Sequence, residues 1–154
     1  MQARLEMLKR LAALYISVEE MHSVELTRTT AAVREAQQAI VSEDHMVQSA
    51  RVDGRGALQR EDSMGWMMAE TLREAAARRR QEFEQLRLKR EELKDAAREQ
   101  YVASRLKKEQ IQRVFNDIAA RVEMEEGRRT QAALDDRFAA RRRWTDAREK
   151  LRNE

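Results

Sequence analysis

The stretch VDGRGALQREDSMG, residues 52–65, decides the fold that this sequence predicts. It holds three of the four glycines in the chain, and Asp53 beside Gly54 is typical of a turn. Asp62 or Ser63 is suited to cap a helix that begins after it. The 154 residues contain no proline, so nothing else in the chain interrupts a helix as strongly. We therefore expect the chain to reverse direction within this stretch.

The segments on either side of the reversal are predicted to be long helices. We expect one helix over about residues 2–51, a turn over about 52–65 and a second helix over about 66–150, within a single domain spanning 1–154. In the first helix, apolar and small residues recur at steps of three and four in two runs. The runs are offset by about one residue, which predicts a stutter in a coiled-coil seam. They are Leu11, Leu14, Val18 and Met21, then Val33, Ala36, Ile40, Val47 and Ala50.

The composition favours an all-α, elongated two-helix antiparallel coiled-coil hairpin. Charged residues make up 38% of the chain and aromatic residues only 5%, which is typical of long helices with a narrow apolar seam. No residue is a cysteine, and the histidines are His22 and His45. Glu19 and His22 form one Glu-x-x-His pair, whereas a di-iron bundle needs two such pairs and further glutamates. We expect no catalytic residues, no metal, no cofactor and no enzymatic activity.

The charge pattern argues against nucleic acid as a partner. Arginine triplets occur at residues 78–80 and 141–143, but acidic residues lie among them and the net charge is only +3. The longest apolar run, residues 11–18, is too short to span a bilayer. We expect a cytoplasmic protein that does not insert into the membrane directly.

Large apolar side chains gather just after the glycines, and Met46 and Val47 are expected opposite them on the first helix. Tryptophan is enriched at binding hot spots, and methionine packs adaptably against several partners. These residues either cap the end of the seam or bind another protein, and several large side chains so close together cannot all face one seam. We define this predicted turn patch as Met46, Val47, Trp66, Met67, Met68 and Leu72.

The two helices are predicted to differ in length by roughly 35 residues, or about 50 Å at the α-helical rise. If residue 51 faces residue 66, Leu5 lies opposite Ile111 or Gln112, and the chain beyond has no neighbour within the hairpin. Unpaired apolar residues on a long helix need a cover, for which we expect another protein. The residues concerned are Phe115, Ile118, Val122, Leu134, Phe138 and Trp144.

Two segments resemble the FliJ/YscO family of flagellar export and type III secretion. They are RRTQAALDDRFAARRRW, residues 128–144, and YVASR, residues 101–105. The length, the early turn and the charged final helix are also similar to that family. The resemblance implies a central stalk in a hexameric export ATPase, with further contacts to the export-gate membrane protein and to export chaperones. It also implies a cytoplasmic protein held at the inner membrane through these partners.

The resemblance also assigns partners to the two ends of the hairpin. The turn patch would meet the gate, and the end of the second helix would enter the ATPase ring. The ring-binding residues implied are Leu134, Arg137, Phe138, Arg141 and Arg142. The alternative interpretation is a structural coiled-coil dimer or scaffold without a role in export, in which the seam after Ile111 closes against a second copy.

Overall fold

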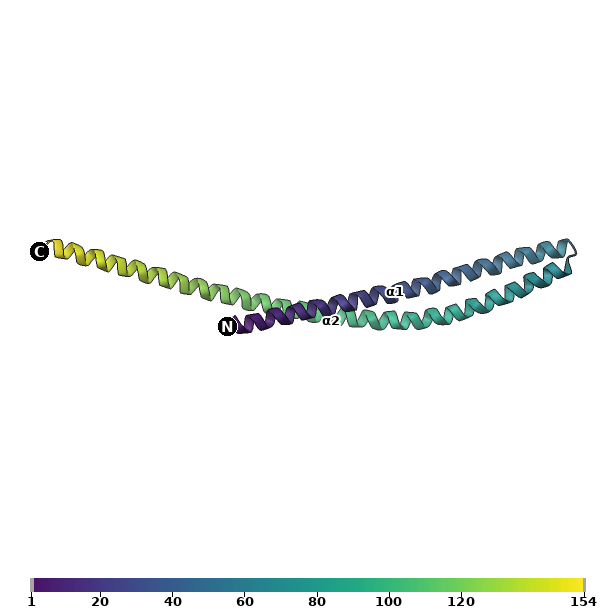
Figure 1. The fold of residues 1–154 in the computed structure, drawn as a ribbon, viewed down its shortest axis with the longest axis horizontal. Helices are drawn as coiled ribbons and strands as arrows, with labels where there is room; N and C mark the ends of the chain where they lie inside the picture. Colours follow the sequence, from purple (N-terminus) through teal and green to yellow (C-terminus); the bar gives the residue numbers. More distant parts are fainter. Residues whose placement is uncertain (1, 154) are drawn as a thin grey trace. The chain divides into compact units, whose positions relative to one another are not determined.

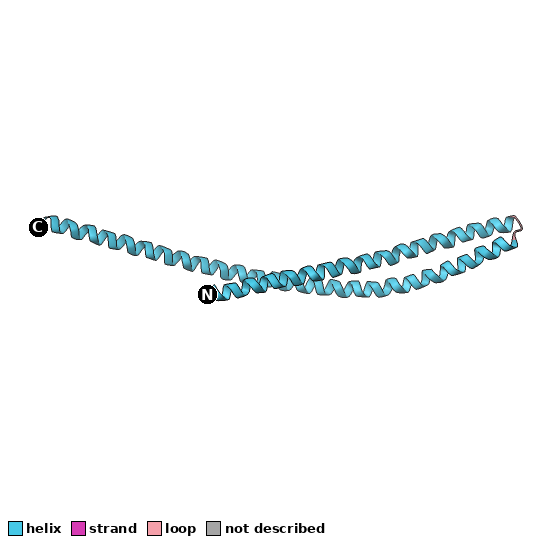
Figure 2. Cartoon of the chain, viewed as in Figure 1, coloured by secondary structure: helices cyan, strands magenta, loops and turns pink. Residues whose placement is uncertain are grey.

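The computed structural model describes residues 2–153, with side chains described for residues 3–150 and 152. Helix α1 spans Gln2–Gln59 and helix α2 spans Ser63–Asn153, and residues 60–62 connect them (Figure 1). The described residues include no strand (Figure 2). The two long helices pack against each other, which confirms the predicted all-α helical hairpin.

The reversal lies within residues 52–65, but α1 continues through Gly54 and Gly56 and ends at Gln59. Both glycines have ordinary helical backbone, since no glycine in the described chain has a positive φ. Glycine inside a helix costs about 1 kcal/mol relative to alanine. Packing against α2 outweighs this cost, because Gly54 is buried and faces Ala69 across the seam. The glycines therefore allow close contact between the helices, and the turn itself is shorter than expected.

The chain forms two compact units, one of residues Ser17–Leu106 and one of Met1–Ile16 with Lys107–Glu154. In each unit, the less exposed positions of both helices recur at alternating steps of three and four. This pattern runs from Leu5 to Ala57 on α1 and from Ala69 to Glu125 on α2. Such unbroken heptads are the pattern of a coiled-coil seam.

The predicted stutter in α1 is wrong. Leu11, Leu14 and Met21 are exposed, while the neighbouring Ala12 and Tyr15 lie in the seam. The heptad register of the residues from Val33 onward continues back toward the N-terminus with no stutter. It excludes the larger apolar side chains of the first run, although these matched a helical period equally well.

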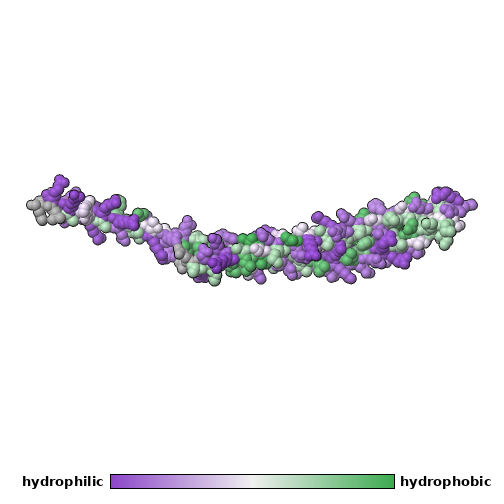
Figure 3. Space-filling model, viewed as in Figure 1, coloured by the Kyte–Doolittle hydropathy of each residue, from purple (hydrophilic) through white to green (hydrophobic). Residues whose placement is uncertain are grey.

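The seam is built largely from small residues. Ala36, Ala57 and Ala76 are at most 2% exposed, and no large side chain among the described residues is fully buried. Alanine lets two helices approach closely but leaves larger neighbours at the margin, where Figure 3 shows hydrophobic side chains at the surface among hydrophilic ones. Arginines from α2 bridge the helices as well. Arg90 Nη1 donates to the Ala32 carbonyl at 2.7 Å, and the Arg79 Nε donates to Glu43 Oε1 at 3.0 Å.

The register of the helices corrects the predicted start of the unpaired segment. Continuing both heptads from the facing pair Gly54 and Ala69 brings Leu5 opposite Ile118, one heptad beyond the expected Ile111. The shift follows from the short turn, which leaves more of α1 available for pairing. As a result Phe115 and Ile118 are half-buried and Val122 is buried, so these three residues are not unpaired.

Helix α2 nevertheless extends beyond α1. The helices have 58 and 91 residues, so α2 is longer by 33 residues. Within its unit, α2 has its last buried residue at Val122 and its last half-buried one at Glu125. Every residue from 126 to 150 is exposed. We call residues 126–150 the C-terminal segment.

Candidate functional site

The connection between the helices is a tightly hydrogen-bonded turn. Glu61 has a positive φ of 58°, which is the left-handed conformation common just after a helix. The Asp62 N–H donates to the Ala57 carbonyl at 2.9 Å, and the Glu61 N–H donates to the Leu58 carbonyl at 3.1 Å. These two bonds form a Schellman motif, which satisfies carbonyls left free at the end of α1.

Asp62 then starts α2. Its Oδ1 accepts a hydrogen bond of 2.9 Å from the Gly65 N–H, and its carbonyl accepts one of 3.1 Å from the Trp66 N–H. Asp62, rather than Ser63, is therefore the N-cap of α2. A Cβ on Gly65 would come within 2.9 Å of the Asp62 Cγ and 3.3 Å of the Ala57 Cβ. Glycine at this position permits both the cap and the close approach of the helices.

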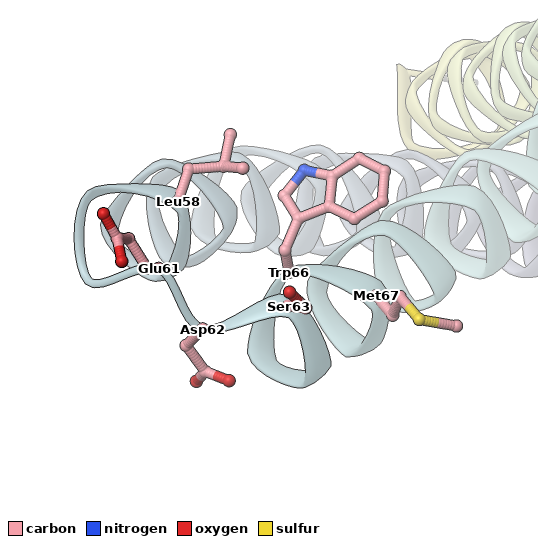
Figure 4. A pocket seen from close by; sticks show the side chains of 6 residues that line it. All are labelled: Leu58, Glu61, Asp62, Ser63, Trp66 and Met67. Atoms are coloured by element: carbon pink, nitrogen blue, oxygen red, sulfur yellow. The ribbon is translucent and has the colours of Figure 1, made fainter.

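This close approach leaves large side chains on the outside of the turn. Leu58, Trp66 and Met67, with the polar residues Glu61 to Ser63, line a cavity of about 350 Å³. Figure 4 shows the Leu58 and Trp66 side chains on the same side of the turn, with Met67 directed along α2. Trp66 is 40% exposed, whereas Leu58 and Met67 are about 60% exposed. The indole is thus partly packed at the end of the seam and partly available to a partner.

A second cavity adjoins the first and shares Met67 with it. It has a volume of about 330 Å³ and is lined by Met64, Met67, Met68, Thr71 and Leu72. The three methionines and Leu72 are all more than half exposed. Together, the two cavities form a mainly apolar surface around the end of the hairpin. We define this turn surface as Leu58, Met64, Trp66, Met67, Met68 and Leu72.

Two residues of the predicted turn patch do not belong to this surface. Met46 and Val47 lie 12 to 13 residues before the end of α1, or nearly 20 Å along the helix. Val47 is half-buried in the seam and Met46 is 46% exposed beside it. Conversely, Leu58 was missed because the first helix was expected to end at Arg51. Its only signal in the sequence is that it is a large apolar residue outside the heptad seam.

Charged groups border the turn surface. On α2, Arg73 forms a hydrogen-bonded ion pair with Glu70. The hydrogen bond from Arg73 holds the pKa of the Glu70 carboxyl below its usual value. Glu61 and Asp62 provide carboxylates at the other side. The surface therefore has an apolar centre and a polar rim, as protein-binding surfaces have.

The predicted ring-binding residues all lie on the exposed C-terminal segment. Leu134 is 51% exposed and Phe138 is 78% exposed. Arg137, Arg141 and Arg142 are exposed as well, and within the described part of the chain their guanidinium groups form no ion pair. Other charges there are locally paired, such as Arg129 with Glu125 at 2.8 Å. The segment thus presents apolar side chains together with arginines that are free to bind carboxylates.

A further aromatic group lies on the same segment. Trp144 is 66% exposed, and the Arg148 guanidinium lies 5.4 Å from the centre of its ring. This is within the range of a cation–π interaction. Trp144 was predicted to be unpaired but was not assigned to the ring-binding set, and its exposure places it among the candidate binding residues.

The structure offers little else that resembles a site. Over residues 2–153, no group of three acidic, histidine or cysteine side chains is arranged to hold a metal ion. His22 lies in the seam, where its Nδ1 is buried and has no hydrogen-bond partner. None of the described helices has a stretch long and apolar enough to cross a membrane.

Comparisons of this chain with models of protein families, with curated proteins and with solved structures found no match.

Proposed function

We propose that this chain is a non-enzymatic component of a type III protein-export apparatus, flagellar or injectisome, and acts as the central stalk of its hexameric ATPase. In this proposal the C-terminal segment lies within the ATPase ring. The turn surface faces the export-gate protein, and export chaperones are further partners. The protein is cytoplasmic and stays near the inner membrane through these contacts.

One observation carries the proposal, namely the exposure of the entire C-terminal segment. A helix of 25 residues gains little stability on its own in water. Phe138 and Trp144 would each contribute roughly 1.5–3 kcal/mol if they became buried. A helix about 10–12 Å wide can enter the opening of a protein ring. Unpaired arginines beside these aromatics fit a ring lined with carboxylates, since guanidinium binds carboxylate in a bidentate manner.

The test is a binding assay between the purified chain and the export ATPase from the same cell. Arg141→Glu and Phe138→Ala should each weaken binding at least tenfold, because they remove a charge pair and an apolar contact respectively. Arg78→Glu is the matched control, since Arg78 is an exposed arginine in the other unit. The proposal fails if the unaltered chain does not bind the ATPase, or if Arg78→Glu weakens binding as much as Arg141→Glu.

The contact with the gate is tested separately. Met67→Ala and Met68→Ala should weaken binding to the cytoplasmic domain of the gate protein without lowering the melting temperature, because both side chains are about 60% exposed. Met21→Ala is the control, since Met21 is also well exposed, at 69%, but lies far along α1. Equal effects of the three changes would place the gate contact away from the turn surface.

A further inference from the structure

One flank of the hairpin formed by residues 17–106 is apolar along much of its length. On α1, every second seam residue is Val33, Ile40 or Val47. The residues just before these are Ala32, Ala39 and Met46, seven residues apart. On α2 the corresponding positions hold Leu72, Arg79, Leu86 and Leu93, also seven residues apart. We call the six apolar residues among these the apolar flank. The leucines and Met46 are between 37% and 63% exposed.

Two contacts show that these residues of α1 and α2 share one side of the hairpin. Arg90 lies one helical turn from both Leu86 and Leu93, and it donates to the Ala32 carbonyl on α1 at 2.7 Å. Arg79, midway between Leu72 and Leu86, pairs with Glu43 at 3.0 Å. Glu43 in turn lies one helical turn from Ala39 and Met46.

The opposite flank is charged. On α2 it carries Glu84 and Glu91, which both accept hydrogen bonds from Arg87, at 2.6 and 2.7 Å. On α1 it carries Asp44, which pairs with Arg80 at 2.5 Å. The hairpin therefore has one charged flank and one flank that is apolar except at Arg79, whereas an isolated two-stranded coil needs only the seam to be apolar.

On α2 the seam also carries Arg73, Arg80, Arg87 and Arg90, but on α1 the seam and the flank together give up to three apolar positions in a heptad. This is the pattern of helices in a bundle, where each helix has more than one neighbour. The buried residues of this seam are mainly alanines, so the seam covers few large side chains, and the leucines of the flank remain exposed to water. A third or fourth helix is needed to cover them.

We propose that two copies of this chain pair through the apolar flank to form an antiparallel four-helix bundle. With the twofold axis along the helices, α2 of one copy lies antiparallel to α1 of the other, in the register that the hairpin already uses. Leu86 and Leu93 of one copy then meet Ala39 and Ala32 of the other, so that large side chains fit against small ones. The same flank serves both copies, as a twofold interface requires.

The size of the surface agrees with a reversible dimer. Between Leu72 and Leu93 the flank is about 32 Å long at the helical rise, and two helices give a width of about 20 Å. Each copy would bury about 600 Å², or about 1,200 Å² in total, which is the lower end for a specific interface. The dimer belongs to the free protein and does not depend on a role in export.

The proposal is tested by sedimentation equilibrium of the full chain between about 1 and 100 µM. The unaltered chain should approach twice its mass of 18.1 kDa at the upper concentrations. Leu93→Lys should raise the dimer dissociation constant at least tenfold, because it places a charge in the interface. Leu88→Lys should leave it unchanged, since Leu88 is similarly exposed, at 51%, but lies off the flank.

Circular dichroism of each variant shows whether the hairpin remains folded, and Leu93→Ala replaces Leu93→Lys if the latter unfolds. A chain that stays monomeric at 100 µM would overturn the proposal and leave the flank to a helix of another protein. An equal loss of dimer in the Leu88→Lys and Leu93→Lys variants would overturn it as well, because the interface would then not be this flank.

Discussion

The Asp62 carboxylate accepts a hydrogen bond of 2.9 Å from the backbone N–H of Gly65, and this contact starts α2 directly after the turn. A side chain on Gly65 would collide with the same carboxylate. The two residues therefore act together. Asp62 is the N-cap, and Gly65 lacks the side chain that would collide with the capping carboxylate. Because only residues 60–62 separate the helices, the cap also influences where α1 and α2 first meet.

Asp62→Ala should lower the free energy of unfolding by about 1 kcal/mol, because it leaves N–H groups at the start of α2 without an acceptor. Asp62→Asn is the control and should cost much less, since its side-chain oxygen can accept the same bond. Urea denaturation of the three proteins at equal concentration measures the difference. Equal destabilisation by alanine and asparagine would show that the carboxylate charge, and not the cap, is responsible.

Glu61→Gly should raise stability by about 1 kcal/mol. Glu61 has a φ of 58°, a conformation that costs a residue with a side chain roughly 1–2 kcal/mol and costs glycine little. Gln59→Gly, two residues earlier in helical backbone, should instead destabilise the protein by about 1 kcal/mol. Opposite shifts of the melting temperature in these two variants are the expected result. A lower melting temperature for Glu61→Gly would mean that the glutamate side chain contributes a contact stronger than the strain it causes.

The backbone amides of the C-terminal segment should exchange hydrogen fastest among the described residues of the free protein. No side chain there is buried, so local opening exposes almost no apolar surface. Gly127→Ala should slow exchange around it, because alanine favours helix by about 1 kcal/mol and nothing lies within 4 Å of the added Cβ. Exchange measured by mass spectrometry after proteolysis resolves this segment. Protection of residues 126–150 equal to that of the seam would show that the segment already has a packing partner.

Acid should weaken the hairpin as the pH falls below the ordinary glutamate pKa of 4.5. Arg73 lowers the pKa of Glu70, and Arg87 lowers that of Glu84, in each case mainly by a hydrogen bond to the carboxylate. A pKa lowered by folding means stability that is present above the unfolded value and lost as the pH falls through the folded one. Melting temperatures measured between pH 7 and pH 3 should therefore drop below about pH 4.5.

The double variant Glu70→Gln with Glu84→Gln provides the comparison for this effect. It should melt at a slightly lower temperature at pH 7 and show a smaller further drop on acidification. Both glutamates are only half-buried, so the effect should also shrink when salt screens the pairs. An unchanged acid profile in the double variant would assign the acid sensitivity to other carboxylates of the chain.

The helical class and the position of the reversal within residues 52–65 could be predicted from local features alone. The absence of proline leaves the backbone free to continue as helix, and Asp62 has the side chain that a helix start needs. The excess length of α2 follows from the position of the reversal along the chain. These properties depend on neighbours in sequence, so composition and periodicity are sufficient to find them.

Packing between the helices decided the rest. Leu11 and Leu14 match a helical period as well as Ala12 and Tyr15 do, and only contact with α2 selects the latter pair for the seam. Gly54 reads as a turn residue but lies inside α1, because Ala69 packs against it across the seam. For the same reason Met46 is separated from the turn surface and Leu58 joins it. Periodicity along one chain identifies a helical face, but the register between two helices depends on which small residues meet, and that is a property of the tertiary structure.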